Sequence, residues 1–250
     1  MKHREVTLDD KYDLVEGKAY MTGIQALVRL PLDRKRLDRA AGHNTGGFIS
    51  GYRGSPLGGY DQQLRAAQKW LDAHDVKFWE GLNEDLGATA VWGSQQLGLF
   101  PGAKFDGLFG IWYGKAPGVD RTGDVFKHAN AAGTSALGGV LSVIGDDHNC
   151  KSSTLPSQSE FAMMDAEIPV LNPASIQDVL DYGIHGWEMS RFSGAWTGLV
   201  ALADTMDSGA VVDLGLNRFA VVAPNFQLPE DGVHMRRGDV PLSKEARLRQ

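Results

Sequence analysis

The sequence has few of the residues that secreted and membrane proteins depend on. Its one cysteine, Cys150, permits no internal disulfide and no all-cysteine iron–sulfur cluster within this segment. No run approaches the roughly 18 apolar residues of a membrane-spanning helix, and residues 1–10 are too polar for a signal peptide. We therefore predict a cytoplasmic, globular protein without a membrane partner.

Basic residues are not in excess either. The 25 Lys and Arg residues stand against 31 Asp and Glu residues, a net charge of −6, which predicts no nucleic-acid partner. Neither a Walker loop nor a G-x-G-x-x-G motif is present, so the usual phosphate loops have no support. The 250 residues are enough for one large α/β domain or two small ones.

Glycine is abundant, with 31 residues and no short repeat, which indicates tight turns and close backbone approaches. Short apolar runs alternate with helical patterns, which predicts an α/β fold: a doubly wound, mostly parallel sheet with helices on both faces. The predicted strands are 47–50, 76–79, 107–113, 139–144, 168–171, 197–203 and 210–214, and the predicted helices are 22–30, 60–74, 86–97, 124–132, 157–164 and 175–192. We expect the basic stretch 32–41 to be helical or solvated.

The chain is predicted to have three parts. Residues 1–19 are an N-terminal extension and residues 20–220 form the α/β domain. Three prolines followed by a charged end predict that residues 221–250 are an exit linker toward a following domain that is absent here.

In such a sheet, ligands bind where the strands end. The first predicted strand runs into a glycine-rich turn, in which Pro56 holds Ser55 extended so that its hydroxyl and N–H can face a ligand. A turn without a ligand is the alternative. After 107–113, Arg121 stands among small residues and could bind an anion, or it could form an ordinary ion pair with Asp120 or Asp124.

The exit of the strand at 139–144 is the most polar of all. Consecutive residues rarely point at one ion, so we predict no metal site there, and a lone cysteine is more often inert than nucleophilic. Hydrogen bonding to a substrate is the favoured role for the residues of this exit, which include Asp146, Asp147, His148, Lys151, Ser152 and Ser153.

One acidic helix start stands out. Asn83 is placed to cap the helix that follows, and Gly87 and Ala88 begin a face with almost no side-chain bulk. Such a face admits a neighbouring backbone or a flat ligand. Glu84 lies at its mouth, where it is either a partner of the helix dipole or a group with a chemical role.

Several ordered motifs resemble a known family. They are G-Y-R-G-S-P at 51–56, N-E-D-L-G-A at 83–88, K-A-P-G-V-D-R-T-G-D at 115–124 and G-D-D-H at 145–148, followed by two serines. Over residues 20–215 the chain resembles the N-terminal, pyrimidine-binding domain of 2-oxoacid:ferredoxin oxidoreductases, most closely the fused indolepyruvate ferredoxin oxidoreductases. These enzymes use thiamine diphosphate and iron–sulfur clusters to convert an arylpyruvate to an acyl-CoA and reduced ferredoxin.

The resemblance implies that Glu84 bonds N1′ of the thiamine aminopyrimidine and promotes its imino form. It places Gly54, Ser55, Pro56, Gly87 and Ala88 at the cofactor. It assigns the substrate side to Ser55, Arg121, Asp146, Asp147, His148, Lys151, Ser152 and Ser153. Some relatives hold the substrate carboxylate with an arginine that has no counterpart in residues 152–158, so either Lys151 substitutes for it or the substrate contact differs.

The resemblance also implies groups outside this segment. A diphosphate-binding domain, in the same chain or a partner chain, would carry Mg²⁺, and [4Fe-4S] clusters would lie elsewhere. Ferredoxin, a 2-oxoacid and coenzyme A are the implied partners, in an oligomer, and the segment alone would be inactive. The helix face 87–93 is a plausible docking face for the second domain. The alternatives are half of a transketolase- or decarboxylase-type thiamine enzyme, and a non-catalytic scaffold.

Overall fold

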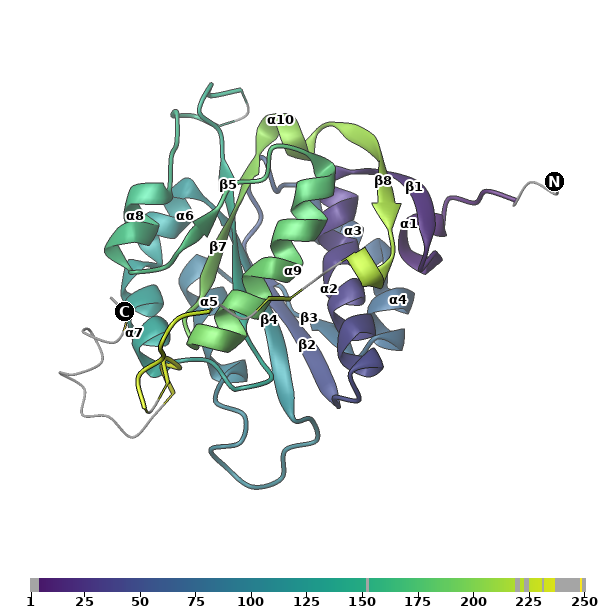
Figure 1. Ribbon diagram of the computed structural model, residues 1–250. Helices are drawn as coiled ribbons and strands as arrows, with labels where there is room; N and C mark the ends of the chain where they lie inside the picture. The colour runs from purple at the N-terminus through teal and green to yellow at the C-terminus, as the bar shows by residue number, and fades with distance from the viewer. Residues whose placement is uncertain are drawn as a thin grey trace.

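A six-stranded parallel sheet forms the centre of the computed structural model, which describes residues 5–151, 153–218, 221–222, 225–230, 232–236 and 248. The strand order is β3-β2-β4-β5-β7-β6, and helices cover both faces (Figure 1). This confirms the predicted fold class. The strands are β2 (Thr45–Gly51), β3 (Val76–Phe78), β4 (Gly107–Lys115), β5 (Val140–Asp146), β6 (Val170–Leu171) and β7 (Thr197–Leu202).

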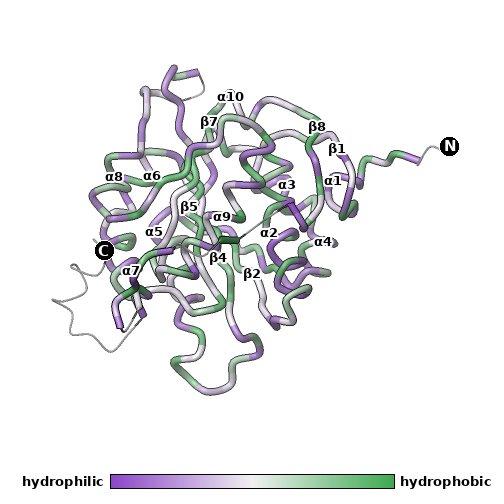
Figure 2. Tube along the Cα trace, viewed as in Figure 1, coloured by the Kyte–Doolittle hydropathy of each residue, from purple (hydrophilic) through white to green (hydrophobic). Residues whose placement is uncertain are grey.

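The helices divide between the two faces of the sheet. One face carries α2 (Gly23–Ala40), α3 (Tyr60–Ala66) and α9 (Ile176–Ser193), and the other carries α5 (Glu84–Ser94), α6 (Ala116–Arg121), α7 (Gly123–Ala132) and α8 (Glu160–Asp165). Shorter helices are α1 (Asp10–Asp13), α4 (Gln68–Ala73), α10 (Ala203–Met206) and the 3₁₀ turn η1 (Leu216–Arg218). Hydrophobic and hydrophilic residues alternate along the helices (Figure 2).

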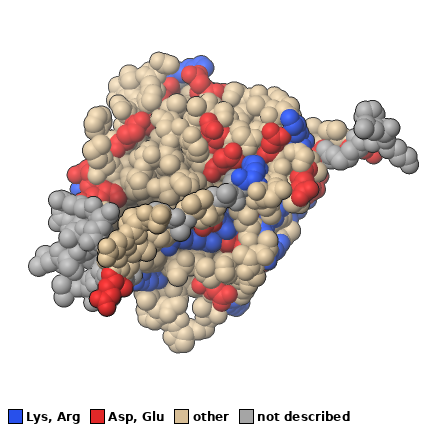
Figure 3. All heavy atoms as spheres, viewed as in Figure 1, with Lys and Arg blue, Asp and Glu red and all other residues tan. Residues whose placement is uncertain are grey.

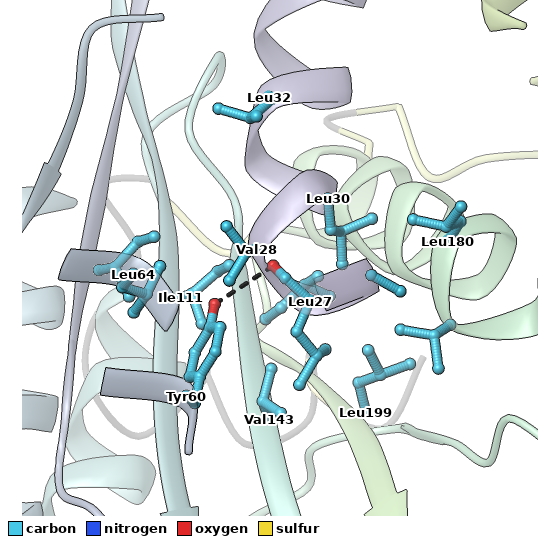
Figure 4. Close-up of a cluster of buried hydrophobic side chains, with 14 of the residues drawn as sticks. Leu27, Val28, Leu30, Leu32, Tyr60, Leu64, Ile111, Val143, Leu180 and Leu199 are labelled. Atoms are coloured by element: carbon cyan, nitrogen blue, oxygen red, sulfur yellow. Dashed lines mark hydrogen bonds between the residues drawn. The ribbon is translucent and has the colours of Figure 1, made fainter. Parts of the chain in front are cut away.

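Two apolar clusters hold the layers together. Aliphatic side chains fill the larger cluster, where the Tyr60 hydroxyl on α3 donates to the Leu27 carbonyl on α2 at 3.3 Å (Figure 4). The smaller cluster contains three aromatic rings, those of Trp112, Phe126 and Trp196, and Trp112 and Phe126 meet edge to face at 4.8 Å. On the visible surface, acidic and basic side chains are interspersed (Figure 3).

Helix α2 differs from its prediction. The Thr22 cap is confirmed, since its side chain accepts from the Gln25 N–H and the Gln25 side chain accepts from the Thr22 N–H. The helix runs on to Ala40, however, and Arg34, Lys35 and Asp38 within the stretch 32–41 are buried. The solvated alternative for this stretch is therefore wrong, because α9 covers this side of α2 and supplies ionic partners.

Two further elements depart from the sequence reading. The predicted helix 60–74 is two helices, α3 and α4, that meet at Ala67. Strand β8 (Gly209–Leu214) forms at its predicted place but pairs antiparallel with β1 (Gly17–Thr22) in a separate two-stranded sheet. Strand β1 was not predicted, and its first residues belong to the segment 1–19. Among the described residues, no helix is both long and apolar enough to cross a membrane.

Candidate functional site

The order of the strands reverses between β2 and β4. From β2 the chain moves outward to β3, and from β4 it moves the other way to β5. In open α/β sheets, ligands bind in the crevice at such a reversal, beyond the carboxyl ends of the strands. Helix α5 begins over this crevice, and the predicted cap is confirmed, since Oδ1 of Asn83 accepts from the Leu86 N–H at 2.9 Å.

Glu84 is the first residue of α5 and is only 8% exposed. Its side chain lies against Gly118 at the centre of α6, where a Cβ would come within 2.8 Å of Oε1. The Trp112 indole donates to the Glu84 carbonyl at 3.0 Å and so fixes the helix start. The carboxylate makes no hydrogen bond to the described part of the chain and still reaches solvent. A nearly buried carboxylate is thus left open to a ligand.

The small residues of α5 let the helix lie directly on the sheet. A Cβ at Gly87 would stand 2.8 Å from the Gly51 Cα at the end of β2, so the close backbone approach takes place inside the fold. Ala88 is buried in the same layer. On the outer side of α5, Leu86 is 50% exposed and Gly93 faces open space. Only this outer side remains for the predicted docking of a second domain.

The glycine-rich turn after β2 contacts both neighbouring strand ends. A Cβ at Gly54 would meet the Lys115 side chain at 2.9 Å, and a Cβ at Gly145 would meet Pro56 at 3.1 Å. The Ser153 hydroxyl donates to the Ser55 carbonyl at 3.5 Å. The exits of β2, β4 and β5 therefore lie together, as the motif order predicts, and Ser55 and Ser153 are brought into contact.

The two aspartates at the end of β5 organise the loop that follows. Asp146 is fully buried and accepts from the N–H and the hydroxyl of Ser159 at 2.9 and 2.7 Å. Burial raises the pKa of Asp146, partly offset by the Ser159 bonds. The Asp147 carboxylate accepts from the N–H groups of Lys151 and Ser153, both at 2.9 Å. Both side chains thus bond to this loop.

The remaining predicted residues lie at the surface. Arg121 pairs with Asp85 of α5 at 3.2 Å. The partners considered from sequence were Asp120 and Asp124. Lys151 pairs with Asp204 at 3.0 Å, which raises the pKa of Lys151. His148 is exposed, and Ser152 lies outside the described residues. Each of the two cations thus already has an acidic partner.

The sequence reading missed the groups that flank Glu84. Gly118 belongs to helix α6, which is absent from the helices predicted from sequence, and a Cβ at Gly114 would stand 3.5 Å from the Glu84 side chain. A signal for α6 was present, because Ala116-Pro117 after a strand places proline in the first helical turn, where it is favoured. No sequence pattern indicated that the Trp112 indole would donate to the Glu84 carbonyl.

Comparisons with known proteins show a similarity of fold. No protein-family profile matches the sequence, and no curated protein is similar to it. The fold is similar to that of the 2-oxoglutarate:ferredoxin oxidoreductase from Magnetococcus marinus, solved with 2-oxoglutarate, coenzyme A and succinyl-CoA bound. The TM-score is 0.62 at 14% identity, over 86% of this chain and 34% of that one. The chain thus spans about a third of that protein's length and shares its fold over this part.

Proposed function

We propose that this chain is the pyrimidine-binding domain of a thiamine diphosphate-dependent 2-oxoacid:ferredoxin oxidoreductase. The observation that carries the proposal is the Glu84 carboxylate, nearly buried at the strand-order reversal and without a hydrogen-bond partner in the described chain. The similarity in fold to an oxidoreductase of this chemistry supports it, as does the motif order.

The residues around Glu84 fit an aminopyrimidine ring. Gly114 and Gly118 leave its carboxylate clear of side-chain bulk, so that a flat ring can reach it. In this proposal Glu84 accepts a hydrogen bond from the protonated ring nitrogen and exchanges that proton. Bound thiamine diphosphate would supply the electron sink for decarboxylation, while the chain supplies orientation and proton control.

The turn after β2 and the loop after β5 form the proposed substrate side. Ser55 and Ser153 touch each other and can present hydroxyls to a keto acid. Asp146 and Asp147 act by holding the loop in place. Lys151 or Arg121 would meet the substrate carboxylate only by exchanging its present acidic partner. An arylpyruvate such as indolepyruvate is the proposed substrate, with coenzyme A as acyl acceptor.

The rest of the machinery is proposed to lie outside this chain segment. A diphosphate-binding domain would carry Mg²⁺, and [4Fe-4S] clusters would pass electrons to ferredoxin. The outer side of α5, with Leu86 and Gly93, is the proposed docking face for that domain. The assembly is proposed to be a cytoplasmic oligomer.

The test compares the full-length protein with its Glu84→Gln variant. Thiamine diphosphate binding is measured by calorimetry, and turnover by 2-oxoacid-dependent reduction of a viologen dye. Loss of a proton-exchanging group should lower turnover by about 10²–10⁴-fold. Asp124→Asn is the matched control, because it also removes a carboxylate from a first helical turn but at an 89% exposed side chain. Normal turnover in Glu84→Gln would overturn the assignment.

Parallel assays identify the substrate and the class. Indolepyruvate and 2-oxoglutarate are offered separately with coenzyme A, and preference for 2-oxoglutarate would contradict the arylpyruvate assignment. Decarboxylation without dye reduction would move the chain to the decarboxylase class. If the complete protein fails to bind thiamine diphosphate, the chain is a scaffold and the proposal is wrong.

A further inference from the structure

Three side chains converge where β5 ends. Asp146 is the last residue of β5, His148 lies two residues on, and Glu160 is the first residue of α8. A carboxylate oxygen of each acid and a ring nitrogen of His148 lie within 4.8 Å of one another. We call these three residues the acid–histidine cluster. Asp147 does not belong to it, because the Asp147 carboxylate bonds the loop backbone.

The two carboxylates of the cluster have no Lys or Arg partner in the described chain, and His148 is the basic group that lies beside them. Lys127 and Lys151 pair instead with Asp165 and Asp204. Oε2 of Glu160 is shielded from solvent and has no hydrogen-bond partner among the described residues. Two carboxylates this close, one of them fully buried, repel each other unless a proton or a cation lies between them.

The cluster shares one feature with metal sites, a hydrogen-bonded outer group that orients one of the ligands. Ser159 donates two hydrogen bonds to Asp146 and so fixes the orientation of its carboxylate, as outer groups do around metal ligands. His148 is exposed and keeps one side of the site open to solvent.

We propose that Asp146, His148 and Glu160 bind a zinc ion, with water in the fourth position. One imidazole nitrogen and two carboxylate oxygens suit tetrahedral Zn²⁺. Mg²⁺ and Ca²⁺ favour sites of oxygen alone and more ligands. The cation neutralises the paired carboxylates and ties the end of β5 to the start of α8. It thereby holds together the two ends of the segment between Asp147 and Ser159, whose Ser153 contacts the turn after β2.

The test uses this chain, treated with a chelator and dialysed, and needs no thiamine diphosphate. Zn²⁺ is titrated by calorimetry, and Co²⁺ is added as a spectroscopic probe of a tetrahedral site. We expect one Zn²⁺ per chain. Changes to outer groups alone weaken metal binding about 10–100-fold, so Glu160→Gln and His148→Gln should weaken it at least that much. Circular dichroism shows whether each variant is folded.

The matched control is His128→Gln. His128 is an exposed histidine on α7 beside an acid, Asp124, and its loss should leave zinc affinity unchanged. A second readout is trypsin cleavage after Lys151, which is exposed in the loop and should become slower with Zn²⁺ in the wild type only. If the wild type binds no Zn²⁺, or if Glu160→Gln and His148→Gln bind it as the wild type does, the site is refuted. Glu84→Gln should bind Zn²⁺ normally, which separates this proposal from the proposed function.

Discussion

The Glu84 side chain lies across the backbone of Gly118. A Cβ at Gly118 would stand 2.4 Å from Cγ and 2.8 Å from Oε1 of Glu84, closer than real Cβ contacts come. The two residues come from α5 and α6, which follow different strands on opposite sides of the strand-order reversal. The position of the carboxylate therefore depends on a glycine 34 residues further along the chain.

Gly118→Ala should displace the Glu84 carboxylate. We expect the free energy of unfolding to fall by about 1–3 kcal/mol, the usual cost of overpacking. In the full-length protein, thiamine diphosphate affinity should fall with it. Denaturant unfolding and calorimetry measure the two effects. Gly123→Ala is the control, because a Cβ there meets nothing within 4 Å. Equal behaviour of the two variants would show that Gly118 does not position Glu84.

Two glycines of α5 should respond in opposite ways to alanine. At Gly87 a Cβ would meet the Gly51 backbone at 2.8 and 3.0 Å, so Gly87→Ala should lower the free energy of unfolding by about 1–3 kcal/mol. At Gly93 a Cβ meets open space, so Gly93→Ala should raise it by about 0.5–1 kcal/mol through helix propensity. Denaturant unfolding of this chain measures both. A loss of stability in Gly93→Ala would contradict the open outer side of α5.

The features that sequence predicted are local ones. The caps at Thr22, Asn83 and Ser175 form as predicted, because each needs only a hydroxyl or amide oxygen three residues before an N–H. The strand exits meet because parallel strands of one sheet end at the same edge. The fold class follows from the same local patterns.

The features that sequence missed depend on distant partners. Strand β1 pairs with β8, almost 200 residues away, and no sequence pattern in residues 17–22 identifies that partner. Arg121 bonds Asp85 on another helix instead of its neighbours. Glu160 joins Asp146 and His148 only because α8 returns to the end of β5. Such pairings are decided by tertiary packing, which spacing along the chain does not encode.

Asp61→Asn should stabilise the protein at neutral pH. Asp61 is 2% exposed, and burial together with the neighbouring Glu80 carboxylate raises its pKa. Ionising such a group costs stability as pH rises above its unfolded value of about 4. The variant should therefore gain about 1–3 kcal/mol at pH 7 and little at pH 4. Unfolding at both pH values measures this, with Asp72→Asn as an exposed control. A variant less stable than wild type at pH 7 would show that the Asp61 charge is compensated.

Asp38→Asn should destabilise the protein at neutral pH, because Asp38 is buried between the guanidinium groups of Arg34 and Arg191. Arg191 holds both of its carboxylate oxygens at 2.7 and 2.8 Å, and Arg34 binds at 2.6 Å. Burial raises the pKa of Asp38, but the bonds and charges of Arg191 and Arg34 outweigh it, so the pKa is lowered.

A lowered carboxyl pKa contributes stability above the unfolded value of about 4, and that stability is lost as pH falls toward the folded value. Removing one partner of a buried ion pair costs about 3–5 kcal/mol, so Asp38→Asn should lose that much at pH 7 and show a flatter pH dependence below about pH 4. Asp165→Asn, which breaks the exposed pair with Lys127, should cost about 0–1 kcal/mol. Equal losses in the two variants would mean that the guanidinium groups around Asp38 are solvated when it is removed.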